Sequence, residues 1–407
     1  MRLLLILLFA VVLLCGCTQQ ETPEVQHPVQ PPAAGPEEPI AREPPQQLPE
    51  GVLVGEIPAD ADVIFSSMRY VLNDPACLDG NYELKGNFIN DADCNRKIYA
   101  SDGQLASRKQ LFVMDLGTEH VTQITNTGCH FIGGQAVDSK TIMANAACSD
   151  TDGDGRINDK DAAELYLLHL DSEEMDCLTC GFDLTGINNP DYSPVNGKTI
   201  FSAGSGTGMN NHLYTIDAGK NLVQLTNDSE YMDFDCSWSE DGTKIAFSRL
   251  PQQNYPWTIP TQVWIMGADG MNAEKITNGG ANPSGEENQG PYPIGIDADP
   301  DMSPDNREIA ISRLKTGKLN EPFGVYELVV VDVDTKDETI LDSNYANMVP
   351  EWKEGGILFI RQTGGSTEAV DVKQSLYLYK NGAFEDLEGY PYNVFPLGAH
   401  SASWIER

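Results

Sequence analysis

The fold is decided by a stretch that the chain repeats: Asp191-Tyr192-Ser193-Pro194-Val195-Asn196-Gly197-Lys198-Thr199-Ile200-Phe201-Ser202. Near-copies occupy residues 237–248 and 301–312, and degenerate copies occupy 135–145 and 351–360. Proline presets φ for a turn, and Asn or Gly tolerates a positive φ, so the middle of the stretch predicts a tight turn. The apolar segment that follows predicts a buried strand. Each copy therefore predicts a β-hairpin.

A second pair of strands follows each hairpin. Its first strand recurs at residues 111–115, 165–168, 213–217, 263–266, 328–332 and 376–379, and its second strand often ends in Ile-Thr or Leu-Thr, as at 123–125, 224–226 and 275–277. A repeat of four antiparallel strands, anchored at Tyr192, Trp238, Met302, Trp352 and Trp404, has the length of one propeller blade. We therefore predict an all-β, six-bladed β-propeller of four-stranded antiparallel blades over residues 51–407.

These repeats resemble the TolB-like propeller family, which also supplies the propeller of dipeptidyl-peptidase-type proteins. The resemblance covers residues 51–407 and rests on the Ser-Pro-Asp/Asn-Gly turn followed by a buried strand. It implies a ring that is used mostly for protein–protein contact. Function still has to be argued from a site, because one fold serves many functions.

The two ends of the folded region are predicted to share a blade. Residues 401–404 repeat the start of a first strand with no second strand after it, whereas residues 63–66 form a second strand that lacks its first. We expect the C-terminal strand to pair beside the N-terminal one, because this closes the ring and removes exposed strand edges.

The N-terminus carries targeting information. Arg2 precedes an apolar run over residues 3–14 that is too short to span a bilayer but suits a secretory signal. The run ends Leu14-Cys15-Gly16-Cys17, which resembles a prokaryotic lipobox; the alternative is a plain secretory signal with an incidental cysteine. We expect a signal peptide over 1–16, lipidation of Cys17, and a disordered Pro-rich linker over 17–50. The lipid would be the only membrane anchor, in the cell envelope outside the cytoplasm.

Charge and cysteine content limit the partners. The chain has 61 Asp and Glu against 26 Lys and Arg, for a net charge of −35, which should repel nucleic acid and suits cations, basic partners or plain solubility.

Outside the cytoplasm disulfides persist, and proximity in the sequence suggests the pairs Cys77–Cys94, Cys129–Cys148 and Cys177–Cys180, with Cys236 free. We expect a monomer that binds a protein or peptide.

The sharpest motif lies in residues 148–162, in the connection between the second and third strands of blade 2. Residues 150–161 match an EF-hand calcium loop and resemble the loops of bacterial extracellular proteins such as dockerins, although Asp161 stands where Glu is usual. The alternative is an acidic turn without metal. The predicted Ca²⁺ ligands are Asp150, Asp152, Asp154, the Arg156 carbonyl, Asn158 and Asp161.

Acidic residues also gather where the innermost strands enter the ring. They could hold a hard ion at a channel mouth, or serve only in hydrogen bonding between blades and in turns. They are Asp191, Asp233, Asp235, Asp297, Asp299, Asp301 and Glu351. Most long connections fall on one side of the predicted disc, which favours a binding face there.

No enzyme motif is present: the chain has no G-x-S-x-G, no H-E-x-x-H and no phosphate-binding glycine loop. We therefore expect a calcium-stabilised binding module that is not an enzyme. The alternative is a propeller lyase or hydrolase that acts on acidic polysaccharide through a metal in the central channel. That alternative would be favoured by clustered channel histidines, for which His130 and His400 are the candidates, whereas a channel of carboxylates and carbonyls would favour the binding module.

Overall fold

The computed structural model describes residues 51–67, 109–118, 120–155, 157–158, 160–205, 210–252, 260–279, 296–316, 325–363, 373–387 and 402–405. The predicted signal peptide, the linker, Cys17, Cys77, Cys94, Arg156, His400 and most of the long connections lie outside these residues. Within the described ranges the structure is all-β, and no helix there is long and apolar enough to span a membrane.

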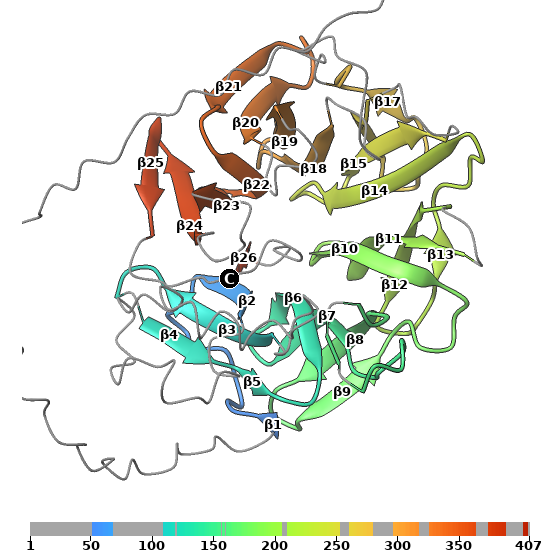
Figure 1. The fold of residues 1–407 in the computed structure, drawn as a ribbon, viewed down its shortest axis with the longest axis vertical. Helices are drawn as coiled ribbons and strands as arrows, with labels where there is room; N and C mark the ends of the chain where they lie inside the picture. Colours follow the sequence, from blue (N-terminus) through green and yellow to red (C-terminus); the bar gives the residue numbers. More distant parts are fainter. Residues whose placement is uncertain are drawn as a thin grey trace, which may run out of the picture. The chain divides into compact units, whose positions relative to one another are not determined.

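The described strands form antiparallel units of four, as the repeats predict (Figure 1). One unit consists of β10 (Thr185–Ser193), β11 (Lys198–Gly204), β12 (His212–Asp217) and β13 (Val223–Gln224). The same order recurs in β6 (His130–Asp138), β7 (Thr141–Ala147), β8 (Glu164–His169) and β9 (Glu174–Cys177), and in β14 (Tyr231–Trp238), β15 (Lys244–Pro251), β16 (Gln262–Gly267) and β17 (Glu274–Lys275).

Two further units share one eight-stranded sheet. They are β18 (Asp297–Met302), β19 (Glu308–Thr316), β20 (Val325–Asp332) and β21 (Glu338–Asp342), and β22 (Ala346–Lys353), β23 (Gly356–Thr363), β24 (Lys373–Lys380) and β25 (Ala383–Asp386). Among the described residues, strand pairing joins them only through a parallel pair of Tyr326 with Ala346, so each half keeps its own antiparallel register.

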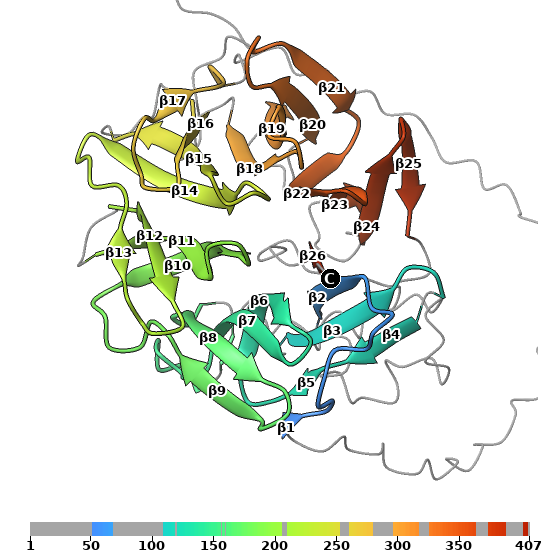
Figure 2. The same cartoon turned by 180° about the vertical axis from the view of Figure 1, so that it is seen from behind.

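The ends of the folded region complete one unit, as expected. Strand β26 (Ala402–Trp404) pairs with β2 (Val63–Ser67), and β3 (Gln110–Asp115) and β4 (His120–Gln123) follow. The first strands β6, β10, β14, β18 and β22 contact one another in chain order, and β26 contacts both β22 and β6. The first strands therefore form a closed circle, with the fourth strands lying outside them (Figures 1 and 2). This is the architecture of a β-propeller.

The hydrophobic core lies between neighbouring units. Ile200 and Leu213 of one unit are buried against Trp238, Ile245 and Phe247 of the next. Because each sheet is covered on both faces, its middle strands are apolar almost throughout, as in the run Ile245-Ala246-Phe247.

A threonine at the end of the fourth strand fastens that strand to the third. Its hydroxyl oxygen accepts a hydrogen bond of 2.9–3.0 Å from a backbone amide of the third strand. The pairs are Thr125 with Leu111, Thr179 with Leu165, Thr226 with Leu213 and Thr277 with Val263. The recurring Ile-Thr and Leu-Thr endings therefore satisfy a strand amide that is buried and has no ladder partner.

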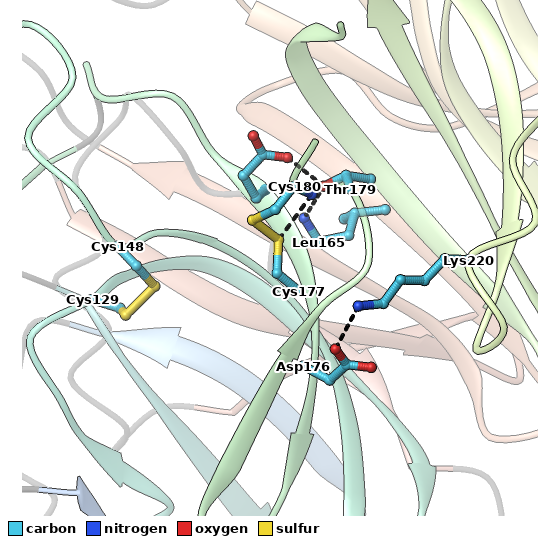
Figure 3. The surroundings of a disulfide bond; sticks show 9 residues. Cys129, Cys148, Leu165, Asp176, Cys177, Thr179, Cys180 and Lys220 are labelled. Carbon is cyan, nitrogen blue, oxygen red and sulfur yellow. Dashed lines mark hydrogen bonds and ion pairs between the residues drawn. A yellow bond between two sulfur atoms is a disulfide. The ribbon is translucent and has the colours of Figure 1, made fainter. Parts of the chain in front are cut away.

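Two predicted disulfides are present in the β6–β9 unit (Figure 3). Cys129 joins Cys148 between the start of β6 and the end of β7, and Cys177 joins Cys180 beyond β9. Cys236 is free and buried, as predicted. A short pair that the repeats did not predict, β1 (Gly51–Val52) with β5 (Thr125–Asn126), attaches the first described residues to the outside of the ring.

The closing strand should control the stability of the whole domain. Removal of residues 402–407 leaves β2 without its partner strand and deletes the half-buried side chain of Trp404. It also removes the hydrogen bond that the Trp404 backbone amide donates to the Glu351 carboxylate. Loss of the indole alone should cost about 2–3 kcal/mol, below the value for a fully buried Trp. We expect the truncated chain, and Trp404→Ala to a smaller degree, to show a lower melting temperature by differential scanning calorimetry.

Deletion of residues 20–40, which belong to the predicted linker, serves as the control and should leave the melting temperature unchanged. A chain truncated at residue 401 that melts like the wild type would refute closure through β26.

Candidate functional site

Four of the first strands share a repeated irregularity of the backbone. Strands β10, β14, β18 and β22 each carry a register shift, and each has a residue with positive φ at the same repeat position. The φ values are 49° at Asn189, 46° at Asp235, 49° at Asp299 and 52° at Val349. Asn and Asp tolerate this backbone conformation, but a β-branched residue such as Val adopts it rarely. The local geometry is thus imposed by the ring and not by residue preference alone.

Two residues after each of these positions, a polar side chain binds the next unit. The carboxylate of Asp191 accepts the Trp238 amide at 2.5 Å, and that of Asp301 accepts the Trp352 amide at 2.5 Å. The same contact joins Gln135 to the Tyr192 amide at 2.7 Å and Glu351 to the Trp404 amide at 3.2 Å, while the Ser237 hydroxyl donates to the Pro300 carbonyl at 2.7 Å. We call this series of contacts the belt. Four of these contacts satisfy backbone amides on the inner edge of the first strands, where no further strand of the same unit pairs with them.

A second series of contacts runs beside the belt. Asn189 Nδ2 donates to Asp235 Oδ1 at 2.9 Å, and the Asp299 amide donates to the Asp235 carboxylate. The Val349 amide in turn points at Asp299 Oδ2 at 3.4 Å. The residues of positive φ therefore also connect consecutive units, and they place the carboxylates of Asp235 and Asp299 beside each other.

The first strands enclose a central cavity of about 110 Å³. Five acidic residues line it, against one lysine, Lys353; the acids are Asp191, Asp235, Asp299, Asp301 and Glu351. Asp301 is 6% exposed, and the other four are half-buried. The structure thus brings together five of the seven acids that the sequence placed at a channel mouth.

Burial in this cavity raises the pKa of several carboxyl groups. Burial, then the charge of Asp299, holds the pKa of Asp235 well above its ordinary value. Burial, supported by the charge of Asp191 and opposed by Lys353, raises the pKa of Asp301 to about 7. Burial likewise raises the pKa of Glu351 well above its ordinary value, with Lys353 opposing and Asp301 and Asp191 adding to the effect. Uncompensated negative charge is therefore unfavourable in the cavity.

The other two predicted acids, Asp233 and Asp297, do not line the cavity. Each is fully buried and forms a two-pronged ion pair with an arginine of the second strand, Asp233 with Arg249 and Asp297 with Arg313, at 2.6 and 3.0 Å in both cases. Arg361, at the equivalent repeat position, instead contacts Asn347 and Asp342. The sequence analysis missed these arginines, although the recurring Ser-Arg-Leu at 248–250 and 312–314 signals them.

The aspartate-rich loop lies between β7 and β8, in the connection predicted for it. One carboxylate oxygen from each of Asp150, Asp152 and Asp154 comes within 4.8 Å of the others, and all three residues are exposed. Asp150 also accepts the amides of Gly153 at 2.7 Å and Gly155 at 2.8 Å, which curls the chain around its carboxylate. Gly155 has φ 85°, a conformation that favours glycine. The three carboxylates are thus pre-arranged at one point.

Asp161 and Asn158 hold this loop from beneath. Asp161, 5% exposed, accepts the Thr151 amide at 2.6 Å and the Asn158 amide at 2.9 Å, and Asn158 is 1% exposed. Burial alone would raise the pKa of Asp161, but these hydrogen bonds outweigh it and lower the pKa. In the structure, Asp161 therefore clamps the loop backbone, whereas its role as a metal ligand stays a prediction.

Among the described residues no histidine lines the cavity. His130 is fully buried at the start of β6, where its Nδ1 accepts the Lys109 amide at 3.3 Å. His400, the other candidate for a histidine cluster, lies outside the described residues.

The high pKa of Asp301 should appear as pH-dependent stability. Its pKa rises from 3.8 to about 7 on folding, so the folded state is more stable with this carboxyl group protonated. The stability that is present below about pH 4 is therefore lost as the pH rises towards 7. In EDTA, Asp301→Asn should flatten the fall in melting temperature over this range, because the amide cannot ionise. The matched variant Asp183→Asn, at an exposed position, should follow the wild type. Parallel curves for wild type and Asp301→Asn would rule out this titration.

No known family model and no curated protein sequence matches the chain. Solved structures do resemble it. A chain of Kuenenia stuttgartiensis hydrazine synthase matches with TM-score 0.53 and 14% identity over 86% of this chain and 47% of that one. A chain of a nidogen/laminin complex matches with TM-score 0.51 and 6% identity over 85% and 98%. TolB from Acinetobacter baumannii gives TM-score 0.49 and 15% identity, and the match covers 82% of this chain but only 63% of the TolB chain. Such likenesses concern the fold alone. The closed circle of four-stranded sheets, with which the first two likenesses agree, gives the protein a β-propeller fold.

Proposed function

We propose that this chain is a six-bladed β-propeller of the TolB-like kind that acts as a calcium-stabilised binding module, held outside the cytoplasm by a lipid on Cys17. The convergence of Asp150, Asp152 and Asp154 carries the calcium part of the proposal. The predicted leader over residues 1–16 and the Pro-rich linker support export and anchoring.

Calcium suits the loop because all its available ligands are hard oxygens. Three carboxylates already meet within 4.8 Å in an exposed position that an ion can reach from solvent. Mutual repulsion of three carboxylates in the free loop would be relieved by a divalent cation. The loop is held on a rigid base, since Cys148 just before it is joined to Cys129 and Asp161 is buried beneath it. Calcium would then order one loop on a preformed hairpin, without a catalytic role.

The aspartate-rich loop lies on the edge of the sheets where we propose that a protein or peptide partner binds. The connections between second and third strands span residues 68–109, 148–163, 252–261, 317–324 and 364–372, whereas most of the turns at the other edge are short. Because strands alternate in direction, these connections emerge on the same edge. Long connections on a rigid scaffold are where binding residues concentrate, so a protein or peptide partner is expected at this edge.

The acidic cavity argues against the alternative enzyme. An acidic polysaccharide would be repelled by five carboxylates, and the described lining offers no histidine for proton transfer or metal binding.

Calcium should bind the loop and raise the melting temperature. With a dissociation constant of about 10⁻⁴–10⁻³ M, 10 mM Ca²⁺ would add about 1.4–2.7 kcal/mol of stability. Isothermal titration calorimetry should detect binding by wild type and by the exposed-site control Asp183→Ala. The double variant Asp152→Ala/Asp154→Ala should lose this binding event. If wild type and double variant respond identically to millimolar calcium, the loop is only an acidic turn.

The binding role has its own test. Immobilised wild-type protein should capture a partner from the native cell envelope in Ca²⁺ and release it in EDTA, because the loop orders part of the binding edge. Asp152→Ala/Asp154→Ala should capture less of the same partner at equal folded concentration. Equal capture by both proteins, with and without chelator, would show that partner binding does not depend on calcium and would contradict this function.

A further inference from the structure

Acidic side chains outnumber basic ones in the described lining of the central cavity. Five acidic residues line it, and Lys353 is the only cation in the described lining. The buried arginines Arg249, Arg313 and Arg361 do not line the cavity; they are committed to acids or amides nearer the edge where the long connections lie. Charges removed from water cost free energy unless an opposite charge accompanies them. The lining therefore favours a positive occupant.

An independent observation points to the same occupant. Asn145 of β7 lines the cavity and is 1% exposed. Its Nδ2 approaches the Ile187 carbonyl at 3.4 Å, but its Oδ1 has no hydrogen-bond partner among the described residues. A buried acceptor without a partner is costly, and the amide orientation set by Nδ2 leaves the oxygen available to a cation or a water bound to one.

We propose that the central cavity binds a hard divalent cation, calcium or magnesium, through Asp235, Asp299, the Asn145 oxygen and cation-bound water. Asp235 and Asp299 are the natural anchors because they neighbour each other in the second series of contacts. Asp191, Asp301 and Glu351 accept the belt amides and add negative charge to the same lining. The oxygen-only lining matches ions that prefer carboxylate, amide and water ligands.

The cation would keep part of its water shell. The two groups of three described ligand residues whose atoms meet within 4.8 Å both lie outside the cavity, at the aspartate-rich loop and at Glu164 with the Cys177–Cys180 disulfide. Fewer than three acidic side chains can therefore reach one point in the cavity directly. A volume of about 110 Å³ leaves room for an ion and several waters, because about 10–15 Å³ of volume on this measure suffices for one water.

The test uses full-length protein in which the loop site is disabled by Asp152→Ala/Asp154→Ala. In this background, Ca²⁺ or Mg²⁺ should still bind in calorimetry and raise the melting temperature. Adding Asp235→Asn/Asp299→Asn should weaken binding about tenfold or more, because the charge is lost while side-chain volume and an acceptor oxygen are kept. Comparing the Ca²⁺ and Mg²⁺ titrations then distinguishes the two ions.

The matched control removes the same charge at exposed positions, Glu56→Gln/Asp183→Asn, and should leave cation binding unchanged. Asn145→Asp is a gain-of-charge variant and should tighten binding, which keeps the test valid if the Asp235 and Asp299 variant fails to fold. The proposal is overturned if the loop-disabled protein binds neither ion, or if binding is unaffected by changes at positions 235, 299 and 145. Loss of the loop site alone would leave this result intact, so the two sites fail separately.

Discussion

The belt of hydrogen bonds between consecutive first strands is the interaction on which the structure depends. A single four-stranded unit would leave its first strand as an open edge around an empty centre. Here the side chain of one unit accepts a backbone amide of the next, as Asp191 does from Trp238 and Asp301 from Trp352. A buried amide without an acceptor is costly, so each contact makes a unit depend on its neighbour. The closing strand enters the same series through Trp404 and Glu351.

The belt also explains the electrostatics of the centre. A carboxylate is a strong acceptor for an amide on the inner edge of a sheet, and this chain uses Asp191, Asp301 and Glu351 in that role. Adding Asp235 and Asp299 from the neighbouring series concentrates negative charge in a small cavity. The carboxylates that join the units therefore make ionisation in the cavity unfavourable, and the pKa values of Asp301 and Glu351 are raised. Protons or a cation can offset this negative charge.

Farther from the centre, acids are treated differently. Asp233 and Asp297 are as buried as any residue in the ring, yet each has a bidentate arginine of its own. The aspartates at 150, 152 and 154 are instead exposed, so water screens their charges. Similar side chains therefore serve as one half of a buried ion pair, as a belt acceptor or as an exposed loop residue, according to the solvent and counter-charge around them.

The sequence by itself determined the repeating strand pattern, the sharing of one unit by the two ends and the position of the aspartate-rich loop, and the proximity of the cysteines suggested the disulfides Cys129–Cys148 and Cys177–Cys180. These features are local or periodic, so residue spacing is enough to find them. Only the tertiary structure decided that Asp191 binds an amide 47 residues away and that Asp233 and Asp297 pair with arginines. It also decided that Asp161 accepts hydrogen bonds from the backbone of its own loop and that Asn145 lines the cavity. Acidic residues at neighbouring positions look alike in the sequence. Their burial and their partners come from other repeats, and these become fixed only when the ring closes.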